Sequence, residues 1–199
     1  MAKTASNAAS STNRMPTSGG LAGRLLRGLQ RTADGSGGLA EASALAKVAE
    51  TATALQLLRV SVETMAEICA DANRACDRAI HAADDTERET PVRRVAERVR
   101  DLTAAGAKAV MPGHPSLVEG AWMLRIPLPG DDAMTVRIPG LRSVPALDAV
   151  LKDTHGSERS RLDALQTGLS EVRVEIRDTR IAILGILDHL NDSLDPAAM

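Results

Sequence analysis

Apolar residues recur in steps of three and four along three separate stretches of the chain. The stretches cover residues 55–83, preceded one heptad earlier by Val48, then 92–109 and 162–190. This spacing puts the apolar residues on one face of a helix, and three such faces can cover one another. We therefore predict a mainly α fold, an antiparallel three-helix bundle or coiled coil. The seam of this bundle is expected to include Leu55, Leu58, Val62, Met65, Val95, Val99, Leu102, Leu165, Leu169, Val172, Ile176 and Ile183.

Between the second and third stretches the pattern changes to short alternating runs. A β-hairpin insert is predicted at about residues 121–140, with strands at 121–128 and 134–138 and a Pro-Gly-Asp-Asp turn between them. Pro127 and Pro139 favour edge strands, because proline has no N–H to donate to a neighbouring strand. An isolated hairpin is marginal in water, so we expect it to lie against the helices.

The ends of the helices follow from turn residues. The second helix is expected to open near Pro91, in its first turn, after a break at residues 81–86, and to end at the Met-Pro-Gly-His-Pro run 111–115. Residues 1–38 are rich in Ser, Thr, Asn and Gly, which predicts a disordered or weakly helical tail. The helical domain is therefore expected to span residues 39–195.

Composition excludes several classes of function. Trp122 is the one tryptophan and Phe and Tyr are absent, which argues against a deep ligand pocket; we expect Trp122 to be buried. The 24 basic and 26 acidic residues are interspersed, which gives no support to specific nucleic-acid binding. The longest apolar run, at 181–187, is far shorter than the roughly 20 residues that cross a bilayer, so no stable membrane insertion is expected.

The two cysteines are the most chemically distinctive side chains. Cys69 and Cys76 lie one heptad apart on the first predicted helix, about 10.5 Å in axial rise, which is too far for a mutual disulfide. We interpret them as buried, inert core thiols; a redox or nucleophilic role is the alternative.

The remaining polar candidates are scattered. No pair of histidines has the spacing of metal ligands, and the paired carboxylates at 84–85 and 131–132 are typical of turns and helix caps. We therefore expect no catalytic residue, no cofactor and no metal site. The histidines are His81, His114, His155 and His189.

The order of the predicted elements, together with several local motifs, resembles the core of bacterial flagellins over roughly residues 39–190. The similar segments are 49–56 (AETATALQ) with 65–68 (MAEI) in the first helix, 84–88 (DDTER) before the second, 134–143 (MTVRIPGLRS) in the hairpin and 159–166 (RSRLDALQ) in the returning helix.

This resemblance implies a structural, non-enzymatic protein of the flagellar filament or its junction. Its partners would be itself or other flagellin-like subunits, contacted through outer apolar positions such as Val60 and Ile68. It also implies a role in motility and an extracellular location. Export would use the N-terminal tail and would not require a signal peptide.

The sequence departs from the flagellin pattern at specific points. Flagellins usually avoid Cys and Trp, whereas this chain contains Cys69, Cys76 and Trp122. Apolar terminal helices of the kind that line a filament channel are not recognisable in residues 1–38. We therefore expect a diverged or junction protein rather than the major filament subunit. The alternative from another class is a cytosolic coiled-coil adaptor that binds partner helices along a groove.

Overall fold

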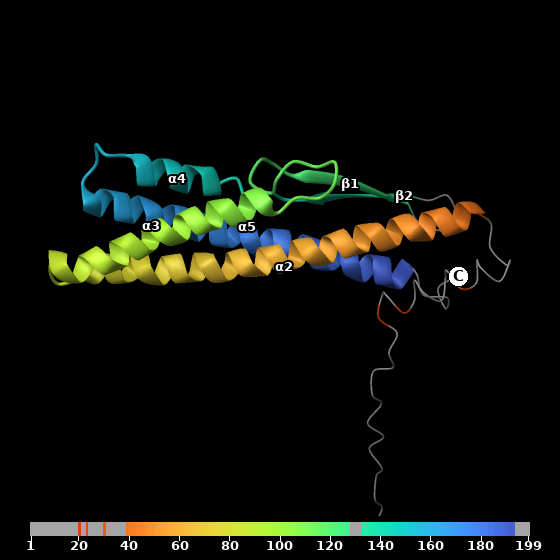
Figure 1. Cartoon of the computed structure of the whole chain (residues 1–199), viewed down its shortest axis with the longest axis horizontal. Helices are drawn as coiled ribbons and strands as arrows, with labels where there is room; N and C mark the ends of the chain where they lie inside the picture. Colours follow the sequence, from red (N-terminus) through yellow and green to blue (C-terminus); the bar gives the residue numbers. More distant parts are fainter. Residues whose placement is uncertain (1–19, 21–22, 24–29, 31–38, 128–132, 194–199) are drawn as a thin grey trace, which may run out of the picture.

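A computed structural model describes residues 20, 23, 30, 39–127 and 133–193 of the chain. In these residues the fold is mainly helical with a small antiparallel hairpin, which confirms the predicted class (Figure 1). The predicted tail at 1–38 and the hairpin turn lie almost entirely outside the described residues. The elements are α2 (Leu39–His81), α3 (Asp85–Lys108), β1 (Trp122–Pro127), β2 (Ala133–Ile138), α4 (Val144–Lys152) and α5 (Glu158–Ser193).

The longest helix, α2, packs against α3 along one part of its length and against α5 along nearly all of it (Figure 1). Its 43 residues correspond to about 65 Å at 1.5 Å per residue. The thiol of Cys69 lies 3.5 Å from Leu169 O and that of Cys76 lies 3.3 Å from Leu162 O. The partner number falls as the number on α2 rises, so α2 and α5 run antiparallel.

The second helix begins earlier than predicted, at Asp85 rather than near Pro91. The Asp84 carboxylate accepts a hydrogen bond from Glu87 N at 2.8 Å, and the Glu87 carboxylate accepts one from Ala83 N at 3.1 Å. These reciprocal bonds satisfy backbone donors at the start of the helix and set its first residue. Pro91 therefore lies inside α3, where it removes one hydrogen bond. Ala83 was expected in the seam but is exposed, because α2 ends at His81.

The hairpin pairs in antiparallel register from Trp122 opposite Ile138 to Pro127 opposite Ala133, and it lies against the helices. Its first strand alternates between buried Trp122, Leu124 and Ile126 and exposed positions. Trp122 is 1% exposed, as expected, and its indole N–H donates to Pro115 O at 2.7 Å. The hydroxyl of Thr179 on α5 donates to Pro139 O at 2.9 Å and ties the end of the second strand to the bundle.

Helix α4 was not predicted from the sequence. It packs against both α3 and α5 and buries Val144 and Leu147. The N-cap residue of α4 is Ser143, and its side chain does not accept a hydrogen bond from the helix. Instead, the backbone N–H and the hydroxyl of Ser143 donate to the Glu175 carboxylate on α5, at 3.0 and 3.1 Å. Gly168 makes room for α4, because a Cβ there would lie 2.7 Å from Leu147 Cδ2. The three-helix bundle thus carries a fourth, short helix at one end.

Candidate assembly surface

The structure places every predicted seam residue inside the bundle, each no more than 4% exposed. They form one continuous core with the inner residues of the hairpin and of α4. Burying apolar side chains in this way stabilises the fold and leaves none of them free to contact a partner. Among the described residues, a surface for assembly therefore has to use side chains that remain exposed on the helices, the hairpin or the loops.

The two cysteines point into the contact between α2 and α5, at 1% and 0% exposure. Each is within hydrogen-bonding distance of a backbone carbonyl of α5, and Asn73 Nδ2 lies 3.9 Å from the Cys69 sulfur. Burial raises the pKa of both thiols to about 11, so both stay protonated at neutral pH. A protonated, buried thiol is a poor nucleophile, which supports a packing role.

An ionic cluster joins α2 to α3. The Asp71 carboxylate accepts from Arg98 Nε and from Arg94 Nη2, both at 2.7 Å. Arg98 also pairs with Asp101 at 2.8 Å. The hydrogen bond from Arg98 lowers the pKa of Asp71 most, against a smaller opposing effect of burial. Sequence reasoning missed this cluster, because it depends on the register between two helices.

The other polar candidates stay apart. In the described residues no group of three or more His, Cys, Asp and Glu side chains could hold a metal ion. Asp84 serves as a helix cap, as the sequence suggested, while the 131–132 pair lies outside the described residues. None of the described helices contains a stretch long and apolar enough to cross a membrane.

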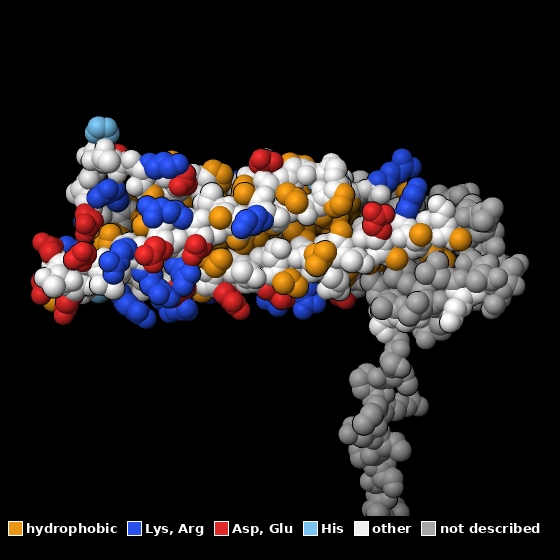
Figure 2. Space-filling model, in the orientation of Figure 1, with side chains coloured by type: hydrophobic (Ala, Val, Ile, Leu, Met, Phe, Trp, Pro, Cys, Tyr) orange, Lys and Arg blue, Asp and Glu red, His pale blue; other side chains and the backbone are white. Residues whose placement is uncertain are grey.

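Outer apolar side chains remain exposed on both long helices. On α2, Leu57 is 67% and Val60 is 60% exposed; on α5, Val174 is 47% and Ile181 is 60% exposed. Ile68, expected beside Val60 as an outer contact, is instead half-buried against the core. Figure 2 shows hydrophobic side chains along the middle of one face, whereas charged side chains gather at the end where α2 passes into α3.

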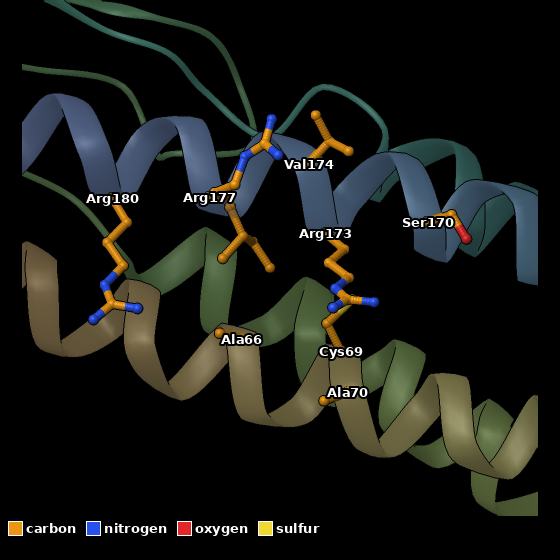
Figure 3. Close-up of a pocket in the computed structure, with 9 residues that line it drawn as sticks. Ala66, Cys69, Ala70, Ser170, Arg173, Val174, Arg177 and Arg180 are labelled. Carbon is orange, nitrogen blue, oxygen red and sulfur yellow. The ribbon is translucent and has the colours of Figure 1, made fainter.

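A groove of about 570 Å³ follows the line where α2 and α5 meet (Figure 3). Ala66 and Ala70 contribute small side chains from α2, while α5 contributes Arg173, Arg177 and Arg180. A smaller polar groove of about 370 Å³ shares Arg173 with the first and is lined on α2 by Asn73 and Asp77. The groove between the two helices thus has arginines on its α5 side and small side chains at its base.

The described molecule is a long helical bundle with a hairpin packed against it, a closed apolar core, and apolar and basic positions on its outer surface. This architecture is similar to that of Bacillus cereus flagellin, with a TM-score of 0.58 and 14% sequence identity. The likeness covers 76% of this chain and 90% of the flagellin chain. No protein-family model and no curated protein matches the sequence. The chain therefore has a flagellin-like fold.

Proposed function

We propose that this protein is a structural, non-enzymatic, flagellin-like subunit that packs side by side with copies of itself or with other flagellin-like subunits. The fold likeness to a flagellin over most of both chains is the observation that carries the proposal. A fold alone does not specify a function, so the surface and the chemistry of the side chains have to agree with it.

The exposed apolar side chains support lateral packing. Leu57 and Val60 lie on the outside of α2, and Val174 and Ile181 lie on the outside of α5, all of them large and at least 47% exposed. Apolar side chains that gather on a surface mark sites of protein contact, because covering them removes apolar area from water.

The cysteines support the non-enzymatic part of the proposal. Cys69 and Cys76 are protonated and enclosed by helices, so neither has the accessible thiolate that a catalytic or redox role requires. Their positions one heptad apart fit a seam between two helices, as the sequence suggested.

The proposal extends to location and partners. The protein would act outside the cell in the flagellar filament or its junction, and would leave by a signal-peptide-independent route that recognises residues 1–38. Motility would then depend on it. Its partners would be copies of this chain or other flagellin-like subunits, and not nucleic acid.

Sedimentation velocity across a concentration series tests the proposal, with the whole chain and with a chain that lacks residues 1–38. A structural subunit is expected to form larger species as concentration rises, and to lose them when the tail is removed. A fixed monomer or dimer at every concentration would overturn the proposal and favour a cytosolic coiled-coil adaptor instead.

A further inference from the structure

We propose that the groove between α2 and α5 binds an amphipathic helix of a different protein, one that carries two carboxylates seven residues apart. This goes beyond the structural role proposed above; Val174 lines the groove and also belongs to the outer apolar positions, so a partner helix and a neighbouring copy would compete there. Three features of the groove carry the inference: the spacing of Arg173 and Arg180, the lack of a carboxylate partner for these two among the described residues, and the small side chains at its base.

The arginines set the spacing. Arg173 and Arg180 lie seven residues apart on α5, about 10.5 Å in axial rise, so they stand almost above one another on the helix. Figure 3 shows both side chains extending from α5 towards α2, whereas Arg177 turns the other way. Two glutamates seven residues apart on a second helix repeat the same spacing and the same facing direction. A helix lying along the groove would therefore place one carboxylate at each guanidinium.

Arg173 and Arg180 form no ion pair within the described part of the chain. Arg177 pairs with the adjacent Asp178 at 3.1 Å. No described carboxylate lies within 4 Å of Arg173 or Arg180, which are both exposed. Guanidinium groups form bidentate hydrogen bonds with carboxylates, so a partner with acidic side chains fits this edge better than a neutral one.

The floor of the groove favours a helix as the occupant. Ala66 and Ala70 are one turn apart on α2, and their short side chains let another backbone approach closely. The groove runs along the line between two antiparallel helices, as does the polar groove that continues it past Arg173. An amphipathic helix that lays an apolar stripe into such a trough is a recurrent mode of recognition.

A second copy of this chain offers a poorer match than another protein. Helix α3 alternates carboxylates with arginines, as in the run from Arg93 to Asp101. An arginine beside each glutamate would face Arg173 or Arg180 and repel it. Helix α5 does carry two exposed carboxylates seven residues apart, Glu171 and Asp178, but Asp178 is already paired with Arg177 at 3.1 Å. We therefore assign the groove to a partner helix with a predominantly acidic flank.

Fluorescence anisotropy with three labelled synthetic peptides tests the proposal, using the whole chain at a concentration where it is monomeric. The probe is a helical peptide with a Leu and Ala stripe flanked by glutamates at positions i and i+7. One control moves the second glutamate to i+5, which turns it away from the first at unchanged composition, and the other replaces both glutamates by lysine. The probe is expected to bind at least about tenfold more tightly than either control, and more weakly as salt rises.

Variants then locate the site on the protein. The double substitution Arg173→Gln with Arg180→Gln is expected to weaken binding of the probe about tenfold. Arg93→Gln with Arg100→Gln removes an equally spaced, exposed pair from α3 and is expected to leave binding unchanged. Ala70→Leu fills the floor and is expected to abolish binding while the helical circular dichroism stays the same.

Several results would overturn the assignment. Equal binding of all three peptides would show that no carboxylate spacing is recognised. An equal loss from the α3 pair would show a general effect of charge. Tighter binding of a short labelled DNA duplex than of the probe, reduced by the same α5 substitutions, would assign the groove to nucleic acid instead.

Discussion

The close crossing of two loops at Gly140 gives a sharp prediction about stability. A Cβ at this position would overlap the Gly120 carbonyl, lying 2.6 Å from its carbon and 2.7 Å from Leu117 O. Non-bonded carbon and oxygen atoms normally stay about 3.3 Å or more apart, so the backbone of one loop has to move. That movement would disturb the 2.9 Å hydrogen bond from Leu141 N to Leu117 O.

The expected cost of Gly140→Ala adds overpacking, about 1–3 kcal/mol, to a weakened hydrogen bond, about 0.5–1.5 kcal/mol. We expect a loss of about 3 kcal/mol in the free energy of unfolding. Gly185→Ala is the matched control: nothing lies within 4 Å of its added Cβ and it is inside α5, so it should stabilise by up to about 1 kcal/mol.

Urea denaturation measures both effects through two signals. Far-ultraviolet circular dichroism follows the helices, and the fluorescence of Trp122, the one tryptophan, follows the hairpin. Gly140→Ala is expected to lower the urea midpoint in both signals, and Gly185→Ala is expected not to lower it. Equal stability of Gly140→Ala and the unmodified chain would show that the two loops do not cross as closely as described.

Three further predictions concern buried contacts. Thr179→Val removes the hydroxyl that bonds to the hairpin and should cost about 1 kcal/mol of stability, whereas Thr167→Val, whose hydroxyl bonds only within its own helix, should cost less in the same urea titration. The lowered pKa of Asp71 stabilises the fold above the ordinary aspartate pKa, and this contribution is lost as pH falls through the lowered value; the urea midpoints of the unmodified chain and Asp71→Asn should therefore converge in acid. If the two urea midpoints instead moved apart as the pH fell, the lowered pKa of Asp71 would not be the cause of the stabilisation. Cys69 and Cys76 should react with a thiol reagent many times more slowly in the folded chain than in urea, while rapid reaction of the folded chain would argue against burial.

The long helices and their buried faces were predictable because heptad spacing is a local signal. Residues such as Leu55 and Leu169 follow it through many turns, and both are fully buried in the structure. The hairpin was predictable for a similar reason, since its alternation and its prolines are read over a few residues.

Features that depend on distant partners were not predictable. Helix α4 has nine residues, and its N-terminus is satisfied by Glu175, more than thirty positions away. The start of α3 was misplaced because Pro91 suggests a first turn, whereas the hydrogen bonds around Asp84 begin the helix earlier. The groove could not be predicted because it is lined by residues of both α2 and α5. The spacing of Arg173 and Arg180 is visible in the sequence, but their position beside Ala66 is not.

Electron cryomicroscopy of the whole chain at its highest soluble concentration would show directly whether the molecules pack side by side. Side-by-side packing predicts ordered assemblies in which rods of about 65 Å, the length of α2, lie next to one another with the outer apolar positions of α2 and α5 at their contacts. Separate single-chain particles, with Leu57, Val60, Val174 and Ile181 exposed to solvent in every one, would contradict it.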